Sequence, residues 1–383
     1  MKRGLLYIAF WLFIILAYGC KETYEPDVNF SATNLLVVEG FLNGSGVTTI
    51  KLSRTTNNSS GGSVTETGAF VTIEDESKNA VSLLESSRGT YMTPRAFIEG
   101  NRYRLLIKTK NGSEYSSEFV TLLHTPEIDS IPWSRVRDGV QIYANTHDRN
   151  NKTRYYRWEY EETWIIVPKY ESRYDIIFNV NANPRDVFPY IIFPRRPEDA
   201  FPDSCWQSEK SKRIILGSSS KLKEDVIHLA PISYIPPASW KLDTRYSILV
   251  RQYALSAAGF EYWENMKKNT EGLGSIFDPQ PSEIRGNITC VTDPKEQVVG
   301  FFDASTAEEK RLFISRKEVS AWKYNSGCVE VSAPDIADSL VVIFPHNIPL
   351  NYDMGPKGGI YTGAAPECVD CRLKGIPVKP DFW

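Results

Sequence analysis

The sequence predicts a mainly β protein built from two immunoglobulin- or fibronectin-like β-sandwich domains. Three observations support this: short runs of alternating apolar and polar residues recur, turn-forming residues separate them, and aromatic residues are abundant. The 383 residues include 9 Trp, 20 Tyr and 18 Phe but only 4 Met. At roughly 150 residues per domain, the chain is long enough for two or three domains with sizeable cores.

The first residues have the pattern of a secretory signal. Two basic residues precede an unbroken apolar run, Leu5–Tyr18, which Gly19 and Cys20 follow. The run of 14 residues is too short for a comfortable transmembrane helix. Cleavage before a cysteine is the bacterial lipoprotein pattern, so we expect residues 1–19 to be the signal peptide and Cys20 to carry the lipid. The alternatives are an ordinary secretory signal or an N-terminal anchor helix.

Residues 20–33 are predicted to be a flexible tether, because acidic residues and a proline directly follow Cys20. Several acyl chains, at ~0.8 kcal/mol for each buried CH₂, would hold the protein on a membrane without any span. The acidic stretch also resembles the signal that sends Bacteroidota lipoproteins to the cell surface. We therefore expect a lipid-anchored protein of the outer membrane that faces the cell surface.

Residues 34–124 are predicted to form the first β-sandwich. Alternation predicts strands around Leu36–Val38, Ile50–Leu52, Val71–Ile73 and Tyr103–Ile107. Asn111-Gly112 lies between two alternating runs and is the strongest short hairpin signal in the chain. The stretch 55–63 is rich in Asn, Ser and Gly, so we expect an exposed loop there. No catalytic constellation is visible in this part of the sequence.

Residues 125–383 are predicted to form a second β-rich domain, elaborated with one helix and a long aromatic insert. Thr125-Pro126 marks the boundary between the two domains. Alternation predicts further strands at Val140–Ile142, Tyr156–Tyr160, Arg213–Leu216, Tyr246–Ala254, Val298–Phe302 and Lys310–Ser315.

The one predicted helix spans about residues 256–270. Ser256 is a suitable N-cap, and two glycines beyond the helix are stop signals. Phe260, Trp263 and either Met266 or Lys267 follow the helical period of 3.6 residues. We expect this stripe to pack into the core rather than to bind a cofactor.

The insert, residues 163–206, is long, irregular and rich in aromatic residues and prolines. Loops of this length are uncommon unless they are functional or disordered. Aromatic and arginine side chains are also enriched at binding hot spots. The insert is therefore a candidate binding surface, and the alternative is that its rings cover the open end of the sandwich. The candidate contact residues are Trp164, Tyr170, Tyr190, Arg195 and Arg196.

Common enzyme signatures do not occur in the sequence. It contains no glycine-rich dinucleotide or phosphate motif, no H-E-x-x-H and no G-x-S-x-G. A formal charge of −3 argues against nucleic-acid binding through bulk basicity. We expect no catalytic residue, no cofactor and no metal, although a carboxylate pair is left open as an alternative. The four histidines show no ligand spacing: His124, His147, His228 and His346.

Five of the 6 cysteines follow Cys20. Outside the cytoplasm, the default is disulfides with one thiol left over. Cys368 and Cys371 have the C-x-x-C spacing, but they lie in a Gly- and Pro-rich segment without the βαβ context of a redox site. A structural role is favoured: either a local bridge between these two, or bridges from each to partners such as Cys205 and Cys328.

Several segments together carry a family resemblance. They are Leu36–Gly40, Asn269–Ile288, Val299–Ser305 with Lys310–Ile314, and Cys368–Gly375 with Lys379–Trp383. With the lipoprotein start, they make the chain resemble domain-of-unknown-function family 4249 of Bacteroidota lipoproteins. The resemblance spans essentially the whole mature chain, and its middle and end motifs are long enough to be specific.

The resemblance implies a role rather than a reaction, because the family has no established activity and no catalytic residue to carry over. Such proteins are typically encoded beside SusC-like TonB-dependent outer-membrane receptors. This implies a non-enzymatic accessory or ligand-capture subunit of a TonB-dependent nutrient uptake system, with that receptor as partner and an unknown small or polymeric ligand. The alternatives are a surface adhesin or structural lipoprotein and, behind these, a surface hydrolase.

Overall fold

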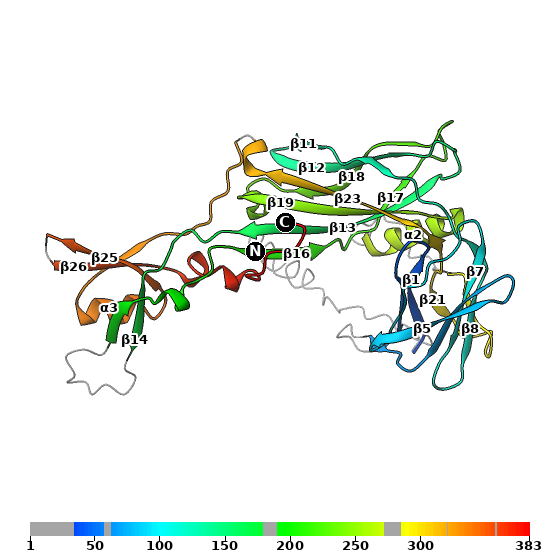
Figure 1. Cartoon of the computed structure of the whole chain (residues 1–383), viewed down its shortest axis with the longest axis horizontal. Helices are drawn as coiled ribbons and strands as arrows, with labels where there is room; N and C mark the ends of the chain where they lie inside the picture. Colours follow the sequence, from blue (N-terminus) through cyan, green and yellow to red (C-terminus); the bar gives the residue numbers. More distant parts are fainter. Residues whose placement is uncertain (1–33, 57–62, 179–189, 272–284, 320, 357) are drawn as a thin grey trace, which may run out of the picture.

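The computed structural model describes residues 34–383, apart from five short gaps: 57–62, 179–189, 272–284, 320 and 357. The expected signal peptide 1–19, the tether 20–33, Cys20 and most of the loop expected at 55–63 lie outside the described residues. The described chain is mainly β, as the sequence predicts, and its several sheets form an elongated molecule (Figure 1).

The N-terminal strands form one continuous sheet that curls into a half-barrel. Its strands are β1 (Leu36–Asn43), β2 (Thr48–Arg54), β3 (Val64–Thr65), β4 (Phe70–Asp75), β5 (Ala80–Ser87), β6 (Thr90–Thr93), β7 (Arg102–Lys108), β8 (Glu114–Ser117) and β9 (Val120–Thr121). The immunoglobulin- or fibronectin-like type is not confirmed, because hydrogen bonding runs unbroken from β4 through β5 to β6 instead of separating two sheets.

Burial in the half-barrel follows the predicted alternation. In β2 and β7 every second side chain is buried, including Ile50, Leu52 and Leu105. The Asn111-Gly112 hairpin is confirmed: it joins β7 to β8, and the Gly112 amide donates to the Thr109 carbonyl at 2.9 Å.

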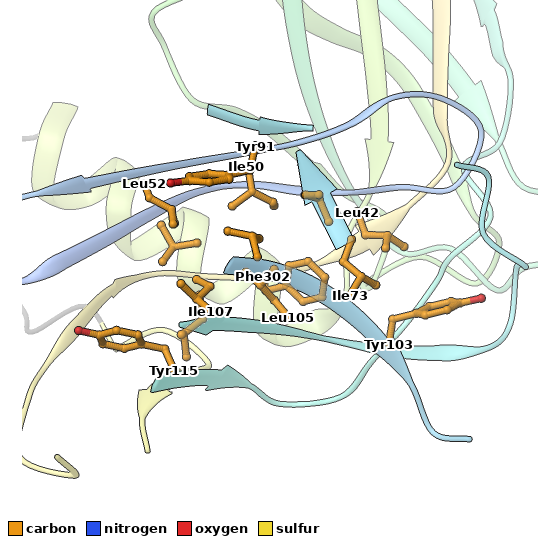
Figure 2. Close-up of a cluster of buried hydrophobic side chains, with 14 of the residues drawn as sticks. Leu42, Ile50, Leu52, Ile73, Tyr91, Tyr103, Leu105, Ile107, Tyr115 and Phe302 are labelled. Atoms are coloured by element: carbon orange, nitrogen blue, oxygen red, sulfur yellow. The ribbon is translucent and has the colours of Figure 1, made fainter. Parts of the chain in front are cut away.

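Residues from much later in the chain complete this half-barrel. They form β20 (Ile288–Cys290), β21 (Val298–Gly300) and β22 (Ala304–Ser305). β20 pairs with β8 at one edge, whereas β21 runs parallel to β1 at the other edge. Phe302 lies within the core formed by the N-terminal strands (Figure 2). The unit expected over residues 34–124 therefore shares its core with residues 288–305.

The second unit places two sheets around another core. Its strands are β10 (Ile128–Ser130), β11 (Trp133–Val136), β12 (Gly139–His147), β13 (Tyr155–Ile166), β16 (Cys205–Lys210), β17 (Ile215–Ser218), β18 (Val226–Ile235), β19 (Arg245–Ala254) and β23 (Ala307–Ser315). β12 pairs with β10, β11 and β18, while β13 and β19 form the centre of the other sheet. Ile142 and Trp158, one from each sheet, are both fully buried in the shared core.

The predicted helix is present as α2 (Ala257–Glu271), which belongs to the second unit. The hydroxyl of Ser256 accepts a hydrogen bond from the Gly259 amide at 3.0 Å, so Ser256 supplies the expected cap. Short 3₁₀ helices occur at Pro197–Asp199, Trp240–Leu242, Arg316–Glu318, Pro366–Cys368 and Cys371–Leu373.

A small distal lobe lies at the far end of the molecule (Figure 1). It contains β14 (Tyr174–Phe178), β15 (Tyr190–Pro194), β24 (Val331–Pro334), α3 (Ala337–Ile343), β25 (Ile348–Gly355) and β26 (Gly358–Ala364). Residues 163–206 are therefore not one irregular insert, since they include the end of β13, the β14–β15 ribbon and the start of β16. The ribbon was not predicted because its two strands are short, with little alternation of apolar and polar residues to reveal them.

Two disulfides hold the neck, residues 366–373, which connects the distal lobe to the second unit. Cys205 is bonded to Cys371, and Cys328 is bonded to Cys368. The sequence left open either a local bridge between Cys368 and Cys371 or a bridge from each to a separate partner. The structure has the separate partners. The remaining described cysteine, Cys290, is a free thiol buried in the half-barrel core.

Candidate functional site

The aromatic residues proposed from the insert do not form one surface. Trp164 is only 1% exposed and packs edge-on against Trp240, with ring centroids 5.4 Å apart. Tyr170 packs at the neck, where its hydroxyl donates to the Cys328 carbonyl at 3.3 Å. Tyr190 begins β15, and its side chain lies outside the described part of the structure. Trp164 therefore stabilises the core and is not accessible to a ligand.

The two arginines of the insert also differ from each other. Arg195 is nearly buried, forms an ion pair with Asp175 at 2.5 Å and lies 4.1 Å above the Phe201 ring. Arg196 is exposed and pairs with Asp199 at 2.7 Å. Arg195 thus holds the β14–β15 ribbon in place, whereas Arg196 is a solvent-facing charge.

A different feature is the best candidate site: a cleft where the half-barrel meets the second unit. Its volume is about 480 Å³, which falls within the usual range for small-molecule sites. One wall is the outer face of β1 and β2, and the other is formed by β13, β19 and α2. The side chains used below are Glu39, Phe41 and Lys51 on the first wall, and Arg157, Glu159, Tyr253, Tyr262, Trp263 and Met266 on the second.

Strand alternation explains why charged side chains line the second wall. Tyr156 and Trp158 on β13 point into the core and are fully buried. Arg157 and Glu159 must therefore point to the opposite face of the sheet. Register places Tyr253 of β19 beside Arg157 on this same face.

Arg157 is held among two rings and one carboxylate. Its guanidinium lies 4.3 Å from the Trp263 ring centroid and 5.2 Å from that of Tyr253, distances typical of cation–π contact. It pairs with Glu159 at 2.9 Å, and the Tyr253 hydroxyl donates to Glu159 at 3.3 Å. The Arg157 Nε has no hydrogen-bond partner within the described residues. The group is therefore positioned, yet part of its donor capacity is unused.

Further rings extend the apolar lining across both walls. Phe41 of β1 contacts Tyr253 edge-on, with centroids 4.7 Å apart, so the half-barrel and the second unit meet here. Tyr262 of α2 packs against Phe301, which follows β21, at 5.2 Å. Burial, with a smaller contribution from the charge of Glu39, raises the pKa of Tyr262 to about 12, so its hydroxyl stays neutral.

Asp303 is a buried carboxylate in the lining of the cleft. Its carboxylate accepts hydrogen bonds from the Ser256 amide at 3.2 Å, the Ser256 hydroxyl at 3.1 Å and the Ala304 amide at 3.0 Å. Burial raises the pKa of Asp303 to about 6, although these hydrogen bonds oppose the shift. Because its oxygens are already bonded, Asp303 connects α2 to the half-barrel and is not a free ligand-binding group.

The cleft shows where the sequence prediction for α2 was wrong. Phe260, Trp263 and Met266 were expected in the core, but all three are only partly buried, and Trp263 and Met266 line the cleft. The buried ring of α2 is Tyr262. The helical period identified a single stripe correctly, but it carried no information about whether that stripe meets a core or a cleft.

The described parts of the chain contain neither a group of three or more side chains suited to a metal ion nor a helix long and apolar enough to cross a membrane. The cleft combines aromatic faces for apolar contact with paired charges that can donate and accept hydrogen bonds. Both kinds of group are typical of ligand-binding sites.

Fold and site together define a mainly β protein of several sheets, with a ligand-sized cleft between two of its cores. The chain belongs to the family described as domain of unknown function DUF4249, whose sequence model matches residues 21–311. The resemblance seen in the sequence is thus confirmed.

Comparison with solved structures gives distant likenesses. One is described as a "putative carbohydrate binding protein" from Bacteroides uniformis, with 9% identity and a TM-score of 0.12, over 60% of this chain and 92% of that one. Another is the B domain of a biofilm-associated protein, with 8% identity and a TM-score of 0.12, over 74% and 86%. These scores carry no argument about fold or function. No curated protein matches the chain.

Proposed function

We propose that this protein is a non-enzymatic lipoprotein of the outer membrane that captures a ligand for a TonB-dependent receptor. The observation that carries the capture role is the cleft between the half-barrel and the second unit. Its rings and charges come from β1, β2, β13, β19, α2 and the segment after β21. Such convergence of apolar and polar groups in one concave site is typical of ligand binding.

The start of the sequence supports the membrane location. Lipid on Cys20 would anchor the chain, and residues 21–33 would space the half-barrel from the membrane. The family resemblance supports the partnership with a receptor.

The anchor is tested with a Cys20→Ala variant. We expect the natural chain to fractionate with outer membranes and to take up radiolabelled palmitate, whereas the variant takes up no label. Labelling of the variant would contradict the lipid-attachment site.

The partnership is tested by mild-detergent purification of the tagged chain from native outer membranes, followed by mass spectrometry. A β-barrel receptor in stoichiometric amount is the expected result. Recovery of the lipoprotein alone would contradict the proposal and favour the adhesin. That alternative has one specific observation in its favour, because Val342 and Met354 of the distal lobe are 71% and 81% exposed.

A further inference from the structure

We infer that the ligand of the cleft is an uncharged saccharide, a ligand class that rests on the capture function proposed above. The inference comes from three features of the cleft: hydrogen-bonding pairs on both walls, aromatic rings on both walls, and a balance of charge. Each is compatible with several ligands, but together they match a molecule with apolar faces and a rim of hydroxyl groups.

Each wall carries a donor beside an acceptor. Arg157 and Glu159 are two residues apart on β13, so they project from the same face of the sheet. Glu39 and Lys51 are direct cross-strand partners on β1 and β2, and both are exposed. Each hydroxyl group of a saccharide can both donate and accept a hydrogen bond. Two neighbouring hydroxyls can therefore accept from a guanidinium or ammonium group and donate to the carboxylate beside it.

Aromatic rings line both walls of the cleft as well. Phe41 belongs to the half-barrel, Tyr253 to β19 and Trp263 to α2, so rings contribute from both sides. Large rings present flat apolar surface with little loss of conformational entropy on binding. The C–H faces of a pyranose ring are apolar while its rim carries hydroxyls, which is the same division of surface that the cleft shows.

The charges of the cleft argue against a strongly charged ligand. Glu39 and Glu159 are balanced by Lys51 and Arg157, and Asp303 is buried with its oxygens already bonded. An acidic or basic ligand would meet like charge on both walls and would have to give up hydration without a surplus of opposite charge. A neutral ligand avoids this cost.

The test is a binding screen with the mature full-length chain, purified in detergent. The probes are an array of neutral gluco-, manno-, galacto- and N-acetylglucosamine oligosaccharides, a matched set of uronic-acid oligosaccharides, and a set of tripeptides. Positive probes are then titrated by calorimetry against Trp263→Ala, Trp263→Phe and Arg157→Gln. The matched control is Phe70→Ala, which removes a 75% exposed ring from β4, outside the cleft lining.

We expect a neutral oligosaccharide to bind. Trp263→Ala and Arg157→Gln should weaken that binding at least about tenfold, while Trp263→Phe keeps most of it and Phe70→Ala changes it less than about twofold. Binding of only acidic probes or tripeptides, still sensitive to Trp263→Ala, would overturn the ligand class but leave the capture function standing. The inference would be overturned if no probe bound, or if Trp263→Ala and Arg157→Gln left the binding unchanged. If the chain also purified without a receptor, the proposed function would be contradicted as well.

Discussion

Asp303 is a buried carboxylate that joins α2 to the half-barrel, and it makes stability depend on pH. Its pKa rises from 3.8 to about 6 on folding, chiefly through burial, so the folded chain binds this proton more tightly than the unfolded chain. The free energy of unfolding should therefore fall by about 3 kcal/mol from this group as the pH rises from about 4 to about 6. Urea titrations at several pH values should show this fall in the natural chain.

Asp303→Asn cannot ionise, so its unfolding free energy should change less over the same pH window, whatever its absolute stability. The exposed Asp381 provides a control, and Asp381→Asn should keep the natural slope. Equal slopes for the natural chain and Asp303→Asn would show that this carboxylate is not the source of the pH dependence.

Glu162 is the centre of a second buried polar group, inside the second unit. It pairs with Lys241 and accepts hydrogen bonds from the Tyr246 hydroxyl at 2.6 Å and the Ser233 hydroxyl at 2.9 Å. Glu162→Ala leaves the two buried hydroxyls without this acceptor, and Lys241 keeps only its pairing with Glu209 at 3.1 Å. We therefore expect a loss of about 3 kcal/mol in the free energy of unfolding. Urea denaturation measures it.

An exposed ion pair gives the contrast. Glu76 pairs with Arg102 where both side chains are about half exposed, at 55% and 49%, so Glu76→Ala should cost less than about 1 kcal/mol. If the two variants lost the same stability, the buried network would not have the importance that its burial implies.

Among the elements, β21 depends on a glycine. Gly300 has φ +149°, and a Cβ there would lie 2.4 Å from the Val38 carbonyl oxygen of β1. Gly300→Ala should therefore disturb the parallel β1–β21 pairing and cost about 2–4 kcal/mol. Gly112 also has a positive φ, of +93°, but faces open space, so Gly112→Ala should cost only about 1 kcal/mol. Thermal unfolding of both variants makes the comparison, and an equal loss would exclude the steric cause.

The neck is the element that the two disulfides link covalently to the rest of the chain. The Cys328–Cys368 bridge spans 40 residues of sequence, so the double variant Cys328→Ser with Cys368→Ser should lose about 4 kcal/mol through the larger entropy of the unfolded chain. Limited proteolysis should then cleave near the distal lobe first. Cys290→Ala keeps both bridges and should retain the natural cleavage pattern. An unchanged pattern in the double variant would mean that packing alone holds the neck.

At the scale of the whole molecule, the half-barrel depends on residues from the second half of the sequence. A fragment of residues 34–124 would leave the outer edges of β1 and β8 unpaired and would lack Phe302 in its core. We expect this fragment to show no cooperative unfolding by circular dichroism. A peptide of residues 285–306 should restore it, and a scrambled peptide should not. Cooperative folding of the fragment by itself would contradict this dependence.

Prediction from the sequence succeeded where the signal is local. The alternation in β2 and β7, the Asn111-Gly112 hairpin and the period of α2 each depend on neighbouring residues, and all are present in the structure. The candidate site was harder. Trp164 and Trp263 are the same type of residue, yet Trp164 is buried in the core and Trp263 lines the cleft. Composition could not separate them, because the difference lies in which distant element packs against each.

The sequence by itself therefore determined the mainly β class, the family, the strand-forming segments and the structural role of the C-x-x-C cysteines. Only the tertiary structure decided that Cys205 pairs with Cys371, that residues 288–305 complete the half-barrel and that Glu39 faces the same cleft as Arg157. The physical reason is distance along the chain. Backbone periodicity and turn chemistry act over a few residues, whereas disulfides, shared cores and clefts depend on the packing of segments that lie 40 residues or more apart in the sequence.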